Sequence, residues 1–228
     1  MIELINLTKS YTTTKGRHYV FRDLNFVFPE GVSIGLMGRN GAGKSTLLQL
    51  IGGMDTPDYG QVKTDKRISW TVGLGSGFQG SLSARDNVRF VARVHSSSPE
   101  EMRERIAFVE EFAEIGKFFD LPMKTYSSGM RSRVTFGLSM AFDFDYYLID
   151  EAMATGDPLF RKKAQAVFAD RVKNANLILV SHNQNDIREY CQMVVVVEDG
   201  QATLFEDVET GLEAYRNMQR QHQAVPQR

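Results

Sequence analysis

The sequence has few of the features that define several common protein classes. It contains one cysteine, Cys191, which excludes an internal disulfide and a cysteine metal cluster. It lacks an apolar run of the ~18–20 residues that a membrane-spanning helix needs. Its 27 basic and 28 acidic residues leave a net charge of −1, without the basic excess of a nucleic-acid-binding protein. These absences favour a cytosolic protein without a nucleic-acid partner.

Length and composition favour one folded domain. The 228 residues suit a large α/β domain, or one that carries a small insert. Hydrophobic residues make up 42% and charged residues 24%, which is ordinary for a globular protein. Met1–Asn6 lack the basic region and apolar core of a signal peptide. If the protein works at a membrane, we expect another molecule to hold it there.

The most informative stretch is Gly38–Ser45, with the sequence GRNGAGKS, which matches G-x-x-x-x-G-K-[ST]. An apolar run typical of a buried strand precedes it (Val32–Met37), and a predicted helix follows (Thr46–Ile51). Glycines allow backbone N–H groups to converge on phosphate oxygens, and a helix start adds its positive dipole end. In this context Lys44 would reach the β- and γ-phosphates, and Ser45 would ligate Mg²⁺. The alternative is a glycine-rich turn without a ligand.

Strand patterns surround this loop. Alternating or aromatic-rich runs predict strands at Ile2–Leu7, Tyr19–Phe21 and Leu24–Phe28, and hence a small antiparallel sheet before the phosphate loop. Pro57–Gly60 predicts a turn, and Asp199-Gly200 between two apolar runs predicts a hairpin.

One aromatic residue near the N-terminus is a candidate ligand contact. The face of Tyr11 suits stacking on an adenine ring, although a core or surface role fits its position equally well.

A helical insert is predicted in the middle of the chain. Ser98, Pro99 and Glu101 have the spacing of a capped helix start. Apolar residues then recur at helical spacing, which indicates packing (Met102, Ile106, Val109, Phe112). We therefore expect helices from about residue 83 to residue 121.

Polar residues follow two apolar runs that predict buried strands. Asp150 and Glu151 end the run from Tyr146, and His182 follows Leu177–Ser181. Carboxyl ends of parallel strands face the ligand crevice of an α/β sheet. There Asp150 would hold Mg²⁺ and Glu151 would accept a proton from water. The alternatives are a solvated strand end and a structural histidine.

Two further loops carry polar groups. Gly73–Ser81 is rich in glycine, which predicts a mobile setting for its one glutamine, Gln79. Ser127, Ser128 and Gly129 precede a predicted helix. They either cap that helix or offer its bare N-terminus to an anion.

Taken together, these motifs resemble the nucleotide-binding subunit of an ABC transporter along nearly the whole chain. Gly38–Ser45 corresponds to Walker A, Gln79 to the Q-loop and Tyr126–Met130 to the signature. Asp150 and Glu151 correspond to the end of Walker B, Ala154–Asp157 to the D-loop and His182 to the switch histidine. The resemblance implies the cofactors ATP and Mg²⁺.

The resemblance also assigns roles to single residues. The implied ATP contacts are Tyr11, Gly38, Arg39, Asn40, Gly41, Ala42, Gly43, Lys44, Ser45, Thr46, Ser127, Ser128 and Gly129. The implied Mg²⁺ ligands are Ser45, Gln79 and Asp150. The implied catalytic residues are Glu151, His182 and Gln79.

The implied fold class is α/β: a P-loop NTPase of the ABC ATPase type with a RecA-like parallel-sheet core. A small N-terminal antiparallel β subdomain and an inserted helical subdomain complete it. Within a single domain over residues 1–228, the core would comprise 1–82 and 128–228, and the helical subdomain about 83–127.

Departures from the common family pattern point to one branch. The signature has Tyr-Ser-Ser-Gly-Met in place of Leu-Ser-Gly-Gly-Gln, and residues 155–157 are Thr-Gly-Asp where Ala-Leu-Asp is common. These variants resemble exporters of capsule, O-antigen and teichoic acid. Four stretches look closest to the ATPase of Gram-negative capsular polysaccharide exporters: Gly16–Phe21, Gly38–Asn40, Gly77–Leu82 and Phe90–Arg93.

That branch implies the partners and the location. We expect a head-to-tail homodimer with ATP in its interface, a separate multi-span permease subunit and further polysaccharide export machinery. The chain would be cytoplasmic and peripheral, on the inner face of the inner membrane. The rival hypotheses are an O-antigen or teichoic acid cargo, a soluble ABC ATPase acting on DNA, ribosomes or cofactor assembly, and a small-molecule kinase.

Overall fold

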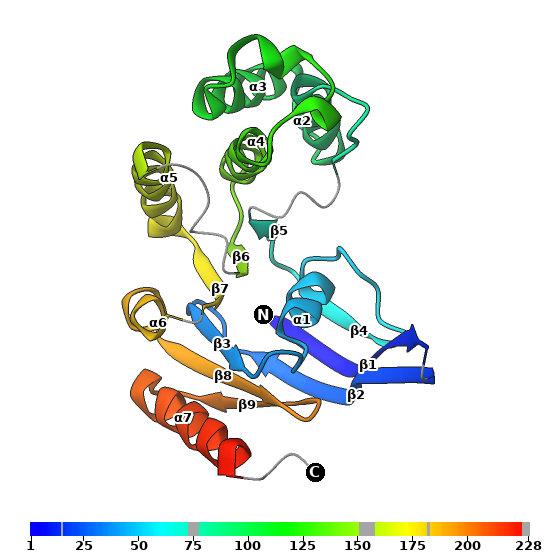
Figure 1. Ribbon diagram of the computed structural model, residues 1–228, viewed down its shortest axis with the longest axis vertical. Coiled ribbons are helices and arrows are strands. Elements are labelled where there is room, and N and C mark those ends of the chain that lie inside the picture. Colours follow the sequence, from blue (N-terminus) through cyan, green and yellow to red (C-terminus); the bar gives the residue numbers. More distant parts are fainter. Residues whose placement is uncertain (15, 73–77, 151–157, 182, 225–228) are drawn as a thin grey trace. The chain divides into compact units, whose positions relative to one another are not determined.

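The computed structural model describes residues 1–14, 16–72, 78–150, 158–181 and 183–224 (Figure 1). These residues form two compact units. The first comprises 1–71, 144–150 and 174–224, and the second comprises 72–143 and 158–173. The expected helical subdomain, 83–127, lies within the second unit, and its boundaries stay a prediction.

A three-stranded antiparallel sheet begins the first unit. Its strands are β1 (Ile2–Thr13), β2 (Gly16–Phe28) and β4 (Tyr59–Thr64), in the order β2-β1-β4. The expected small antiparallel sheet is therefore confirmed. The two strands expected between residues 19 and 28 form one continuous strand, because β2 keeps pairing with β1 through several register shifts.

The expected turn at Pro57–Gly60 is wrong at its second half, because Tyr59 and Gly60 belong to β4. Gly60 has φ +78°, and a Cβ there would lie 2.3 Å from the carbonyl oxygen of Asn6. The glycine therefore permits close approach of two strands rather than a reversal of the chain.

A six-stranded sheet forms the centre of the first unit, in the order β5-β6-β7-β3-β8-β9. The strands are β3 (Ile34–Gly38), β5 (Ile68–Val72), β6 (Tyr146–Asp150), β7 (Asn176–Val180), β8 (Met193–Glu198) and β9 (Gln201–Phe205). β3 runs parallel to both β7 and β8, and β6 runs parallel to β7. The carboxyl ends of β6, β7 and β3 consequently share one edge of the sheet.

The expected hairpin at Asp199-Gly200 is confirmed, because β9 pairs antiparallel with β8 across it. Both turn residues have positive φ, 48° and 76°, as a two-residue hairpin turn requires.

The helices of the first unit are α1 (Lys44–Ile51), α6 (Gln184–Tyr190) and α7 (Val208–Ala224). α1 packs its leucines into a core cluster that includes residues of both sheets, among them Phe21, Leu36 and Ile178. Burying such side chains stabilises the fold by about 1.5–3 kcal/mol each. The shared core fixes α1, and the loop before it, against β2 and β3.

The second unit is helical, and the helices expected from about residue 83 to residue 121 are among those it contains. It contains α2 (Ala84–Val94), α3 (Pro99–Ala113), α4 (Ser128–Met140) and α5 (Pro158–Arg171), with short 3₁₀ turns at Gly116–Asp120 and Met123–Thr125. A further 3₁₀ turn spans Val172–Asn174. Within the described residues, no helix combines the length and the apolarity that crossing a bilayer requires.

Helix α3 begins as its sequence predicts. The Ser98 hydroxyl accepts a hydrogen bond from the Glu101 backbone at 3.2 Å, and the Glu101 carboxylate accepts one from the Ser98 backbone at 2.6 Å. Phe112 on the buried face of α3 stacks on Phe136 of α4, with ring centroids 5.6 Å apart. The capping box fixes where α3 begins, and the stacking of Phe112 on Phe136 orients α3 against α4.

Cys191, which follows α6, provides a test of packing in the first unit. Its side chain is 6% exposed, and burial, followed by the charge of Asp186, raises the pKa of the thiol to about 12. Because the thiolate is the reactive form, we expect the folded protein to resist a maleimide at about pH 8. Mass spectrometry should find one label after denaturation and almost none before it. Rapid stoichiometric labelling of the folded protein would contradict the burial of Cys191.

Candidate nucleotide-binding site

The phosphate loop connects β3 to α1, which confirms the expected order of strand, loop and helix. The helix begins at Lys44, two residues earlier than predicted. Gly41 and Gly43 have φ values of 84° and 99°, in the left-handed region that favours glycine. The Ala42 backbone N–H donates to the Arg39 carbonyl at 3.1 Å. The loop is thus tightly curled, as a phosphate cradle requires.

The Lys44 side chain lies inside the curled loop and bonds to its backbone. It is buried, and its ammonium donates to the carbonyls of Gly38 at 2.8 Å and Arg39 at 2.9 Å. The N-cap residue of α1, Gly43, has no side chain with which to cap the helix, and no acidic residue lies in its first turn. A positive helix end beside a buried cation is chemically suited to an anion such as a phosphate.

Two residues in the first turn of α1 offer hydroxyl groups. Ser45 is exposed, and Thr46 is half-buried. A hydroxyl and a carboxylate are the hard oxygen donors that Mg²⁺ prefers. Ser45 and Asp150 therefore fit a magnesium site in their chemistry.

The loop packs closely against β2. A Cβ on Gly43 would lie 2.4 Å from Cγ1 of Val20 and 2.8 Å from Cζ of Phe21. A Cβ on Gly38 would lie 2.6 Å from the carbonyl oxygen of Val197 in β8. The two glycines let the loop approach β2 and β8 more closely than any side chain would allow.

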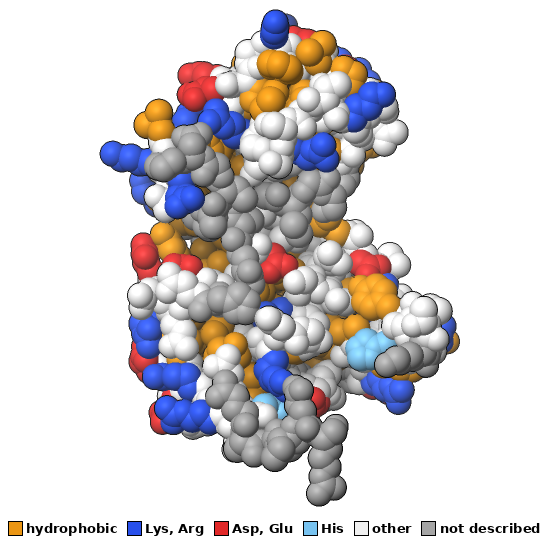
Figure 2. Space-filling model, viewed as in Figure 1, with side chains coloured by type: hydrophobic (Ala, Val, Ile, Leu, Met, Phe, Trp, Pro, Cys, Tyr) orange, Lys and Arg blue, Asp and Glu red, His pale blue; other side chains and the backbone are white. Residues whose placement is uncertain are grey.

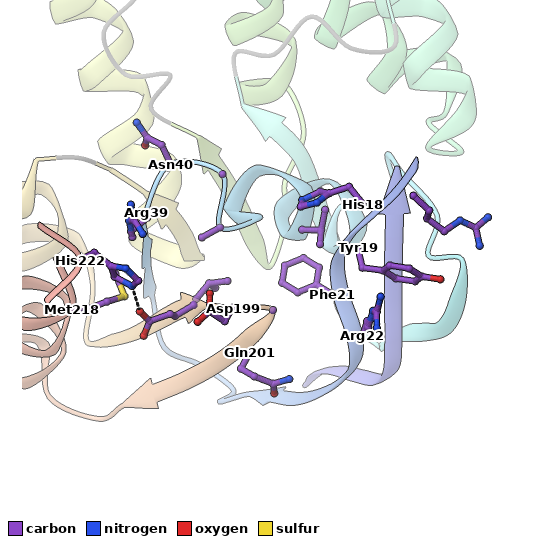
Figure 3. A pocket seen from close by; sticks show the side chains of 17 residues that line it. His18, Tyr19, Phe21, Arg22, Arg39, Asn40, Asp199, Gln201, Met218 and His222 are labelled. Carbon is purple, nitrogen blue, oxygen red and sulfur yellow. Dashed lines mark hydrogen bonds and ion pairs between the residues drawn. The ribbon is translucent and has the colours of Figure 1, made fainter. Parts of the chain in front are cut away.

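An open cavity of about 700 Å³ adjoins the loop, within the range of small-molecule sites. Four segments line it: β2, the loop, the β8–β9 turn and α7. Figure 3 shows His18 and Phe21 projecting from β2, Arg39 from the loop and His222 from α7, where His222 lies 3.0 Å from the Glu198 carboxylate. The lining residues are Arg17–Arg22, Arg39–Ala42, Val197–Gln201, Met218 and His222.

Tyr11 lies on β1, directly opposite His18 in the β1–β2 ladder. It is 40% exposed, so the core alternative is wrong, and its stacking role stays a prediction. Its hydroxyl donates to the Asp55 carboxylate at 2.9 Å. Sequence reasoning missed His18, which lines the cavity beside Tyr11. In the sequence, only the register of the β1–β2 hairpin could have placed His18 opposite Tyr11. The register shifts between these two strands make that register hard to predict from the sequence.

The sheet brings Asp150 to the same edge as the phosphate loop. Asp150 ends β6 and pairs with Val180 of β7, whose other neighbour is β3. It is half-buried, as a strand-end ligand would be. Glu151, residues 154–157 and His182 lie outside the described residues, so their roles stay predictions.

Gln79 belongs to the second unit. Its backbone N–H donates to the Asn87 side chain at 2.8 Å, and the Asn87 amide donates back at 3.2 Å. Asn87 of α2 therefore holds the Gln79 backbone at both polar groups, and the mobile setting expected for this residue stays a prediction. The side chain is exposed. Residues 73–77 of the same loop lie outside the described residues.

Ser127 caps α4, since its hydroxyl accepts a hydrogen bond from the Met130 backbone at 3.2 Å. The capping alternative is thus confirmed. Ser127 and Ser128 are exposed, and Gly129 is half-buried, so capping leaves this helix start accessible. Binding of a nucleotide there stays a prediction.

The loop geometry predicts unequal costs for two alanine substitutions. Gly43→Ala and Gly41→Ala both place a side chain at positive φ, which costs about 1–2 kcal/mol each. Only Gly43→Ala also drives a methyl group into Val20 and Phe21, whereas a Cβ on Gly41 meets no atom of the described residues within 4 Å. We expect Gly43→Ala to lower the free energy of unfolding by a further ~1–3 kcal/mol in urea titrations. Equal losses would contradict the close packing against β2.

Comparison with known proteins follows this geometry. A family profile described as ABC transporter matches residues 21–154. The polysialic acid transport ATP-binding protein KpsT of Escherichia coli is 54% identical over 220 residues, covering 96% of this chain and 98% of that protein. The capsule polysaccharide export ATP-binding protein CtrD of Neisseria meningitidis serogroup B is 40% identical over 218 residues, covering 96% and 100%.

A solved structure shares the fold. It is an ATP-binding cassette in a dimeric post-hydrolysis state with ADP and Pi, with a TM-score of 0.66 and 23% identity. The similarity covers 90% of this chain and 98% of that one. The expected P-loop fold of the ABC ATPase type is thus confirmed. With a family match over more than half of its length and relatives of this identity, the chain belongs to the ABC transporter family, as one of its ATP-hydrolysing subunits.

Proposed function

We propose that this chain powers the export of a lipid-linked capsular polysaccharide across the inner membrane. The observation that carries the ATP-dependent part is the curled loop, in which buried Lys44 lies at the uncapped start of α1. The proposed cargo is supported by the names of two relatives, a polysialic acid transport protein and a capsule polysaccharide export protein. The variant signature Tyr126–Met130 supports the same branch.

ATP would bind with its triphosphate on Gly38–Thr46 and its base near Tyr11. Backbone N–H groups of the loop and the Lys44 ammonium would neutralise the phosphate oxygens. Ser45 and Asp150, together with Gln79, would hold Mg²⁺, which supplies Lewis-acid stabilisation to the β- and γ-phosphates when bound.

The hydrolytic step would use residues that follow two parallel strands. Glu151 after β6 would accept the proton of the attacking water, and His182 after β7 would orient the γ-phosphate. The Gln79 side chain would help to position the water. The sheet order supports this set, because β6 and β7 end at the edge from which the phosphate loop starts.

A second copy of the chain would complete the site. In a head-to-tail homodimer, Ser127, Ser128 and Gly129 of one copy would contact the γ-phosphate held by the other. The exposure of the two serines supports this role, and so does the dimeric state named for the structural relative. Only the closed dimer gains these contacts, so ATP would shift the population toward closure and hydrolysis would release it.

A separate multi-span permease, with further export machinery, would convert closure into transport at the cytoplasmic face of the inner membrane. Figure 2 shows hydrophobic side chains at the surface of the second unit. Phe90 and Val94 on α2 are 59% and 63% exposed, and their spacing places them on one face of the helix. Such an apolar face supports the attachment of a protein partner.

The catalytic proposal predicts a separation of binding from turnover. Glu151→Gln should reduce the ATPase rate by ~10²–10⁴-fold, because the general base is lost while the phosphate loop is intact. With ATP and Mg²⁺, the same variant should accumulate a dimer that light scattering detects. Glu213→Gln, an exposed glutamate on α7, is the matched control and should behave as the parent. A Glu151→Gln variant that hydrolyses ATP at the parent rate would remove Glu151 from the mechanism.

The transport proposal predicts a membrane partner. Tagged chain extracted from its own cells in a mild detergent should co-purify with a multi-span protein identifiable by mass spectrometry. The same extraction with an unrelated tagged ATPase provides the background. Recovery of nucleic acid without a membrane protein would instead support the soluble ABC ATPase hypothesis.

A further inference from the structure

A partly buried ion pair between Lys9 and Asp55 holds the hydroxyl end of Tyr11. The Lys9 ammonium donates to the Asp55 carboxylate at 2.6 Å, and the Tyr11 hydroxyl donates to the other oxygen of the same carboxylate at 2.9 Å. Lys9 is 7% exposed, and its ammonium lies 5.1 Å from the centroid of the Tyr11 ring. The aromatic ring is thus fixed at its hydroxyl and along its face.

The same carboxylate is tied to the helix that follows the phosphate loop. The Asp55 backbone N–H donates to the carbonyl of Gln49 in α1 at 3.2 Å. The Lys9 ammonium also donates to the Thr56 carbonyl at 2.8 Å, which joins β1 to this segment. One short helix therefore carries the phosphate loop at its N-terminus and the anchor of Tyr11 just after its C-terminus.

The carboxylate remains charged in this setting. Burial by itself raises the pKa of Asp55, but hydrogen bonds from Lys9 and Tyr11 outweigh it and lower the pKa below its usual value. A charged acceptor makes stronger hydrogen bonds than a neutral one, so the hold on the Tyr11 hydroxyl is firm at neutral pH.

We propose that Asp55, supported by Lys9, is a positioning residue that sets the Tyr11 ring at a defined distance from the phosphate loop for the nucleotide base. This inference rests on the proposed function, in which Tyr11 stacks on adenine. If the Tyr11 ring is already ordered, nucleotide binding does not have to supply the free energy of ordering that side chain. Asp55 would thereby strengthen the adenine-dependent part of the affinity and leave the triphosphate part unchanged.

The test compares ATP with inorganic tripolyphosphate, which lacks the base, by calorimetry on the full chain with Mg²⁺. Tyr11→Phe keeps the ring but removes its hydroxyl, and Asp55→Asn removes the charge that holds it. Each should weaken ATP binding by about 3- to 10-fold, the range expected for one ordered side chain, with tripolyphosphate unaffected. Because Asp55 acts through the Tyr11 hydroxyl, the double variant should bind ATP no more weakly than Tyr11→Phe alone.

Asp58→Asn is the matched control. Asp58 lies in the same segment and accepts hydrogen bonds from the Ser10 backbone and hydroxyl, but not from Tyr11. It should leave both affinities unchanged.

Unchanged ATP affinity in Tyr11→Phe and Asp55→Asn, equal weakening for both ligands, or the same selective loss in Asp58→Asn would each overturn the positioning role while the proposed function stands. A parent protein that fails to bind ATP would overturn the proposed function and this inference with it.

Discussion

Two hydrogen bonds from a buried ammonium organise the candidate site. The Lys44 ammonium donates to the carbonyls of Gly38 and Arg39, so the phosphate loop curls around this ammonium group. The curled loop leads into the start of α1, where Gly43 offers no side-chain cap, and Gly43 packs against β2. The cavity beside the loop depends on this curl, because loop residues form one of its walls.

Helix α1 fixes the phosphate loop relative to the rest of the first unit through its packing in the core. Its leucines belong to the core cluster that includes residues of both sheets, so the loop and the N-terminal sheet share one rigid support. After its last turn, Asp55 meets Tyr11 and Lys9 of β1. The helix spans only 8 residues, about 12 Å at the usual rise per residue. A short, well-packed element of this kind holds two parts of a ligand site at a constant separation.

The second unit presents its candidate residues on loops that helices anchor. Asn87 of α2 holds the backbone of Gln79 at both polar groups, and Ser127 begins α4 as its cap. Stacked aromatic rings around Phe112 keep α3 and α4 together. Exposed side chains on a rigid scaffold are the common arrangement for residues that meet a partner. This agrees with the proposed contacts of Ser127 with a second copy and of α2 with a permease.

By itself, the sequence determined the features whose causes are local. The glycine-rich motif predicted the strand, loop and helix, and Ser98 with Glu101 predicted a helix start, because the hydrogen bonds involved span only a few residues. Tertiary structure alone decided which distant side chains meet Tyr11. His18 lies opposite it because of the hairpin register, and Asp55, 44 residues away, reaches it because the core fixes α1 against β1. Register and packing depend on the free energy of the whole core, which no short pattern contains.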